Sequence, residues 1–101
     1  MKYHIVQVVR IVDLNEEVLS EVTFDHGNFE TVFLPIGGSV VTYPLGLQGF
    51  EVVYDKRKDE VARYKVIDIE LNLLRNDAMV QAYLEPITLI IGQHDIGQYN
   101  G

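Results

Sequence analysis

Carboxylates with a spacing that allows shared chemistry lie near the C-terminal end of the chain. Asn76-Asp77 can form a two-residue β-turn, because both residues tolerate a positive φ. That turn would place Asp68 opposite Glu85, with Glu70 on the same polar face. Facing carboxylates repel, and a divalent cation, a basic partner, a raised pKa or exposure to water would each relieve the repulsion. We expect a solvated face; if it has a further role, we predict partner binding by Asp68, Glu70 and Glu85.

Basic residues gather in the stretch just before this hairpin. Five of the chain's eight Lys and Arg residues lie there: Lys56, Arg57, Lys58, Arg63 and Lys65. Such a loop could contact an acidic partner or nucleic acid, but Asp59 and Glu60 in the same loop weaken its field. Single-strand binding also needs exposed aromatic rings for stacking, and the pattern predicts that Tyr64 points inward. Lys56, Arg57 and Lys58 are therefore candidate partner-binding residues on a solvated loop.

The chain's histidines are far apart, and one of them carries a partial family resemblance. His26-x3-Glu30-x6-Gly37 resembles the second half of the first motif of the cupins, small β-barrels that hold a metal ion with histidines and a glutamate. The start of their second motif is similar to Gly38-x5-Pro44-x-Gly46. The resemblance covers about a fifth of the chain. It implies a divergent cupin-like metal enzyme as one alternative function.

The chain departs from the cupin pattern at metal-binding positions. Phe24 stands where the first metal histidine would be, and Gly49 stands where the later one would be. The two motifs also adjoin each other, whereas the family separates them by a pair of strands. We therefore predict no metal site in this sequence from its resemblance to the cupins. We expect no cofactor.

Nucleophilic chemistry has no recognisable site in this sequence. The chain has no cysteine, which excludes a disulfide framework and thiolate metal ligands, and favours a reducing compartment. It has no Ser-His-Asp grouping, phosphate-binding loop or zinc spacing. We therefore expect a protein that is not an enzyme.

Composition and charge narrow the class of protein and its partners. The 101 residues include 48% hydrophobic and 23% charged residues, which is typical of one folded domain. A net charge of -7 disfavours binding to nucleic-acid backbones and favours solubility or a basic partner. No apolar run has the length of a transmembrane helix, and the N-terminus lacks the features of a signal peptide. We expect a cytoplasmic protein, or a virion-associated one if its origin is viral.

The elements that position these residues are predicted to be short β-strands. Apolar and β-branched runs separated by turn signals predict strands at 3–12, 18–25, 29–36, 50–55, about 61–73 and about 79–91, with another returning from the Gly37-Gly38 turn. His26-Gly27 is predicted to be the turn before 29–36. No segment has helical spacing. The fold class is therefore all-β, a small seven-stranded antiparallel β-sandwich or partly open barrel built from hairpins. Residues 93–101 are predicted to be a flexible tail of this single domain.

The C-terminal hairpin shows an unusual reversal of pattern. On the turn side of Ile67 and Pro86, apolar positions are odd-numbered in the first strand and even-numbered in the second. Beyond these residues the parity reverses in both strands, which would result from a bent hairpin that buries one face at each end. Residues 50–55 are predicted to extend this hairpin into a meander, pairing Phe50 with Val66, Val52 with Tyr64 and Tyr54 with Ala62.

The loop at 44–49 contains two leucines with two alternative roles. Leu45 and Leu47 either cover the end of a core or stand exposed as partner contacts, and we expect the former because isolated loop leucines are usually buried.

These features predict a non-enzymatic protein that binds other protein chains, including copies of itself, as a phage or viral structural or accessory component would. The compact size, the dense strands and the sheet edges support this hypothesis. One alternative is an acidic inhibitor that occupies the nucleic-acid-binding groove of a host protein. Another is an oligonucleotide-binding barrel that uses the basic loop.

Overall fold

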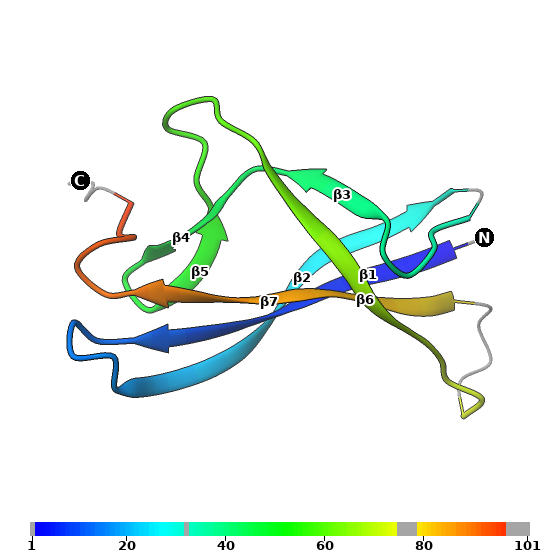
Figure 1. Ribbon diagram of the computed structural model, residues 1–101, viewed down its shortest axis with the longest axis horizontal. Helices are drawn as coiled ribbons and strands as arrows, with labels where there is room; N and C mark the ends of the chain where they lie inside the picture. Colours follow the sequence, from blue (N-terminus) through cyan, green and yellow to red (C-terminus); the bar gives the residue numbers. More distant parts are fainter. Residues whose placement is uncertain (1, 32, 75–78, 97–101) are drawn as a thin grey trace.

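The protein is all-β in a computed structural model that describes residues 2–31, 33–74 and 79–96 (Figure 1). The described residues contain no helix and form seven strands, which confirms the predicted fold class. The strands are β1 (Lys2–Val12), β2 (Val18–Glu30), β3 (Ser39–Thr42), β4 (Leu45–Gln48), β5 (Glu51–Tyr54), β6 (Ala62–Leu71) and β7 (Met79–Ile90).

The strands form two sheets, and the larger one is mixed rather than antiparallel. Its order is β2-β1-β7-β6-β3, and β4 and β5 form a separate antiparallel pair. β1 and β7 are parallel neighbours, so the prediction of a purely antiparallel arrangement is wrong at this pair. Parallel neighbours need a long connection, and here most of the chain lies between the two strands. This arrangement leaves β2 and β3 as the two edges of the larger sheet.

The reversal of apolar parity in the C-terminal strands is caused by β-bulges. Gln7 pairs with Leu84 and Val9 pairs with Ile87, so β7 has one residue more than β1 in this interval. In β6, Ile67 is the extra residue opposite β7. A bulge reverses the parity of a strand while its apolar side chains stay on the same face of the sheet. The predicted reversal is therefore real, but its interpretation as a change of face is wrong.

The C-terminal hairpin is shorter than predicted and has a different register. Ile69 pairs with Ala82 and Leu71 with Val80, two residues away from the expected partners, so the apolar face is preserved. The predicted turn at Asn76-Asp77 lies outside the described residues. Pairing of β6 with β7 ends at Val66, and the first part of β6 pairs instead with β3 as the two ribbons diverge (Figure 1).

The predicted meander is also wrong, because β5 pairs with β4 and not with β6. Leu47 lies opposite Val52 and Leu45 opposite Tyr54, so the predicted loop at 44–49 contains a strand. The β4–β5 pair lies over the half of the larger sheet where β1 and β7 end. Tertiary packing decides this pairing, since the Gly-rich local sequence predicts a loop.

β2 continues through the predicted turn at His26-Gly27. Ile5 pairs with Gly27 and Val6 with Asp25, so His26 is the extra residue of a β-bulge. Gly27 has a φ of 109°, which glycine adopts without strain. The predicted strand at 29–36 is wrong beyond Glu30. The chain instead turns at Pro35–Gly38 and bonds to Val66 of β6 through the Gly37 N–H and the Gly38 carbonyl, at 2.8 Å each.

The core consists of two apolar clusters along β1 and β7. One contains Tyr3, Ile5, Val66, Val80, Ala82 and Leu84. The other contains Val9, Ile11, Leu45, Leu47 and Leu89, beneath the β4–β5 pair. Gln7 lies between them on β1 and is fully buried. The larger sheet is therefore a shared wall of two core halves.

The start of the predicted tail is hydrogen-bonded to β4. The Leu47 N–H donates to the His94 carbonyl at 3.0 Å, and the Ile96 N–H donates to the Leu47 carbonyl at 2.7 Å. Residues 97–101 lie outside the described part of the chain.

Candidate functional site

A buried polar chain crosses the boundary between the two core clusters. Gln7 Nε2 donates to the carbonyl of Glu85 at 2.8 Å, and Gln7 Oε1 lies 2.9 Å from His26 Nε2. On the other side of the ring, His26 Nδ1 lies 2.7 Å from the Tyr54 hydroxyl. These contacts join β7, β1, β2 and β5. The bulge at His26 turns its ring inward from an edge strand.

The order of donors and acceptors in this chain is determined at every step. The Glu85 carbonyl can only accept, so the Gln7 amide nitrogen faces it and the amide oxygen faces His26. That oxygen accepts a hydrogen bond from His26 Nε2–H. The neutral ring then offers Nδ1 as an acceptor, and the Tyr54 hydroxyl donates to it. In the neutral ring the proton is therefore on Nε2, and every group of the hydrogen-bonded chain has a partner.

Burial reinforces this protonation state. It lowers the pKa of His26 below its usual value of 6.5, and the negative charge of Asp25 opposes the shift. Burial also raises the pKa of the Tyr54 hydroxyl. Both groups are therefore uncharged near neutral pH. The hydrogen-bonded chain of Gln7, His26 and Tyr54 joins the strands without burying a charge.

Aromatic packing fixes the positions of the two rings. Phe24 and His26 form a T-shaped pair with ring centroids 4.8 Å apart, and Phe24 and Tyr54 form another at 5.2 Å. Tyr43 also packs against Tyr54, with ring centroids 6.2 Å apart. Contacts of this type favour defined ring orientations.

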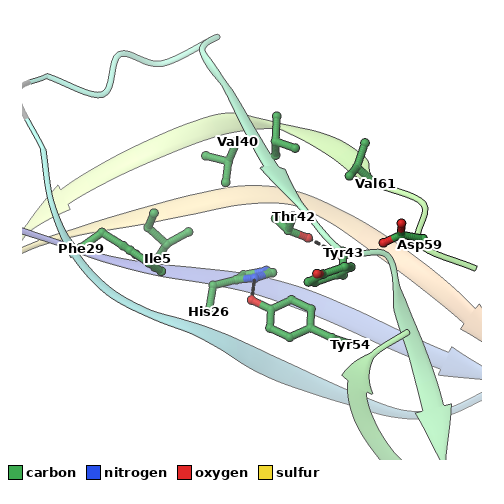
Figure 2. A pocket seen from close by; sticks show the side chains of 10 residues that line it. Ile5, His26, Phe29, Val40, Thr42, Tyr43, Tyr54, Asp59 and Val61 are labelled. Carbon is green, nitrogen blue, oxygen red and sulfur yellow. Dashed lines mark hydrogen bonds between the residues drawn. The ribbon is translucent and has the colours of Figure 1, made fainter. Parts of the chain in front are cut away.

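An apolar pocket of about 550 Å³ opens beside this cluster (Figure 2). It lies between the two edge strands of the larger sheet, with His26 and Phe29 from β2 and Val40 and Thr42 from β3. Ile5, Val41, Tyr43, Tyr54, Asp59 and Val61 complete its lining. Its size and mostly apolar lining are typical of sites for small ligands.

The candidate carboxylates do not meet as the sequence predicts. Asp68 lies opposite Tyr83 and not opposite Glu85, so the expected direct repulsion is wrong. Glu85 accepts a hydrogen bond from the Lys65 N–H at 3.0 Å, and Glu70 accepts one from the Tyr83 hydroxyl at 3.1 Å. These contacts distribute the acidic side chains along β6 and β7. Their role in partner binding stays a prediction.

The basic loop is exposed, and part of its charge is already used. Arg57 forms two side-chain hydrogen bonds with the Asp55 carboxylate, at 2.9 and 2.8 Å. This contact lowers the pKa of Asp55 to about 2. The Lys56 ammonium lies 5.2 Å from the centroid of the Tyr43 ring. Lys58 is exposed, so the loop presents less free positive charge than its sequence indicates.

Leu45 and Leu47 cover the end of the core, as we expect from the sequence. Leu47 is fully buried and Leu45 is 5% exposed. The alternative, that they are exposed partner contacts, is therefore wrong for the chain by itself.

Sequence reasoning missed the pocket and the chain formed by Gln7, His26 and Tyr54. Gln7 is the available signal, because it is a polar residue in an otherwise apolar strand covered on both faces. Its partners come from strands whose pairing the sequence did not predict.

Over residues 2–31, 33–74 and 79–96, no group of three or more His, Asp or Glu side chains could hold a metal ion. In the same part of the chain, no helix has the length and hydrophobicity to cross a membrane. Within the cupin-like stretch, both nitrogens of His26 are hydrogen-bonded to Gln7 and Tyr54.

Comparisons of the chain with protein-family models, with curated proteins and with solved structures gave no match.

Proposed function

We propose that this protein is a non-enzymatic assembly protein that binds other protein chains, in the first place copies of itself. The observation that carries this proposal is the edge strand β2. It is 13 residues long, and most of its side chains are exposed on both faces. Among the strands that the structure describes, β2 pairs with β1 and has no neighbour on its other side. A long open edge offers its free backbone N–H and C=O groups to another strand.

Apolar side chains on this edge add to the proposal. Val18, Leu19 and Val22 are exposed at the end of β2 that is furthest from the pocket, and Leu19 is 51% exposed. Negatively charged Glu21 pairs with Arg10 of β1 at 3.4 Å, so its charge is partly compensated. An exposed edge with apolar side chains is costly in water and is stabilised when another chain covers it.

Exposed apolar residues at two other places offer further contacts for partner chains. Phe50 is 78% exposed at the β4–β5 turn, and Phe33 and Ile36 are exposed in the loop before β3. Large aromatic side chains contribute strongly to protein interfaces when they are buried there. A chain with contact surfaces at different places can form rings or filaments, as structural proteins of phages and viruses do.

Light scattering coupled to size-exclusion chromatography tests self-association. The proposal predicts a mass above the 11.5 kDa of one chain, rising with protein concentration. Leu19→Lys should lower the mass towards that of one chain, because a charge on the edge opposes strand pairing. Leu74→Lys is the matched control, since Leu74 is 94% exposed but lies in the turn beyond the end of β6, away from the β2 edge. A single-chain mass for the natural protein at every concentration would exclude self-assembly.

The charge-based alternatives have less support from the contacts. Asp68 lies opposite Tyr83 and not opposite Glu85, and Arg57 is paired with Asp55. An acidic inhibitor of a nucleic-acid-binding protein would bind less tightly as salt concentration rises. An oligonucleotide-binding barrel would shift single-stranded DNA or RNA in a gel at low salt.

A further inference from the structure

We infer that the pocket between β2 and β3 binds a small apolar ammonium ion, that is, a protonated primary amine with an aromatic or alkyl body. Its volume of about 550 Å³ suits such a molecule. Val40, Val61 and Ile5 provide aliphatic contacts for the apolar body. Phe29, Tyr43 and Tyr54 contribute aromatic rings to the same lining (Figure 2).

The polar groups of the pocket select for a hydrogen-bond donor. The Tyr54 hydroxyl donates to His26 Nδ1, so its oxygen has lone pairs left to accept. Thr42 Oγ1 donates to the Tyr43 carbonyl and is likewise left with acceptor capacity (Figure 2). The third polar group is the Asp59 carboxylate, an acceptor only. A ligand that donates several hydrogen bonds, as an ammonium group does, matches all three.

Charge favours a cation over a neutral donor. In the described residues the ion pairs involve Asp25, Glu21 and Asp55, so Asp59 is not neutralised by any of them. His26 adds no positive charge while it is neutral, and the chain's net charge is -7. Aromatic faces also attract cations.

The Tyr43 ring already shows this attraction to a cation. The ammonium group of Lys56 lies 5.2 Å from its centroid. Lys56 is also the charge that opposes a bound cation at this wall. The ligand's ammonium group is therefore expected on the side of Asp59 and Tyr54.

Three probes with similar bodies and different charges test this inference. Phenethylammonium is positive, 2-phenylethanol is neutral and 3-phenylpropanoate is negative near neutral pH. Each is titrated into ¹⁵N,¹³C-labelled protein, and the methyl signals of Ile5, Val40 and Val61 report binding in the pocket. Phenethylammonium should bind about tenfold more tightly than 2-phenylethanol, as one charge-assisted hydrogen bond to the Asp59 carboxylate predicts. The anion should bind most weakly.

A pair of variants in one loop separates the role of Asp59 from general charge. Asp59→Asn removes the carboxylate and is compatible with the φ of 56° at this position, because Asn tolerates left-handed backbone. It should reduce the preference for the ammonium over the alcohol to about twofold or less. Glu60→Gln changes the net charge equally, but Glu60 is not part of the pocket lining, so the preference should persist. Thermal unfolding confirms that both variants are folded.

Several results would overturn the inference. One is equal affinity for the ammonium ion and the alcohol, which would indicate a merely apolar pocket. Another is an equal loss of preference in Asp59→Asn and Glu60→Gln. The absence of methyl shifts with all three probes at millimolar concentration would show that the pocket is not a ligand site.

Discussion

At the scale of single residues, one histidine joins the two halves of the core. His26 is 9% exposed and contacts Gln7 from β1 and Tyr54 from β5. It lies on a bulge of an edge strand, where its ring turns inward although Asp25 beside it is exposed. Loss of this ring would leave buried polar atoms without partners, and such atoms are costly.

His26→Ala should lower the free energy of unfolding by about 2–4 kcal/mol, because two hydrogen bonds and the packing of the ring are lost. Tyr54→Phe removes only the hydroxyl contact and should cost about 1–2 kcal/mol. Urea denaturation measures both values.

The control is His4→Ala. His4 Nε2 lies 2.9 Å from a carboxylate oxygen of Asp25, but the Asp25 side chain is 63% exposed. Exposed ion pairs contribute at most about 1 kcal/mol, so this variant should change stability little. Equal losses in His4→Ala and His26→Ala would contradict the assigned role of His26.

Stability should fall as pH decreases through the range in which His26 titrates. Burial lowers the pKa of His26, so the unfolded chain binds this proton more readily than the folded one. The stabilisation is therefore complete above the unfolded value of 6.5 and is lost as pH falls through the folded pKa. Asp55, with a pKa of about 2, loses its contribution only at far lower pH.

Urea midpoints between about pH 7.5 and about pH 5 measure this effect. The natural protein should lose stability over this range, and His26→Gln should have a smaller slope. A slope that is unchanged in His26→Gln would assign the titration to another group.

At the scale of elements, close approach of two segments explains Gly46 in β4. A Cβ at this position would lie 2.9 Å from Ile96 Cγ1 and 3.1 Å from the His94 carbonyl oxygen. The segment that follows β7 can therefore pack directly on β4 only because residue 46 has no side chain. This contact positions the two hydrogen bonds between Leu47 and the segment.

Gly46→Ala should destabilise the protein by about 1–3 kcal/mol, since crowding in a packed region has costs of that size. Amide hydrogen exchange should show faster exchange at Ile96, whose N–H bonds to Leu47. In an Ile96→Ala background the same substitution should cost less, because the nearest crowding atom is gone. Equal costs in both backgrounds would show that contact with Ile96 is not the cause.

At the scale of the whole molecule, β1 and β7 run through both apolar clusters. Tyr3 and Ile5 of β1 belong to one cluster, and Val9 and Ile11 belong to the other. The two halves therefore share their central strands, and we expect them to unfold together.

Leu47→Ala should lower the free energy of unfolding by about 2–5 kcal/mol, because it creates a cavity at a fully buried position. Unfolding followed by NMR signals of Tyr3 and Leu89, one from each cluster, should show the same lowered midpoint. Leu74→Ala is the control, and it should change stability by less than about 0.5 kcal/mol at its exposed position. Different midpoints in the two clusters would contradict cooperative unfolding.

The sequence by itself determined the all-β class, the approximate position of most strands and the burial of Leu45 and Leu47. Local chemistry suffices for these, because alternation and turn residues act over a few positions. It also located the parity reversal at Ile67 and Pro86, although not its cause.

Only the tertiary structure decided which strands are neighbours. The parallel pairing of β1 with β7, the pairing of β5 with β4 and the bulge at His26 depend on contacts between residues far apart in the chain. After a bulge, odd- and even-numbered residues exchange the faces of the sheet to which they point. One inserted residue therefore makes the burial predicted from simple alternation wrong for the rest of the strand. The pocket and the chain through Gln7, His26 and Tyr54 arise where these pairings meet. They could therefore not be read from any one segment.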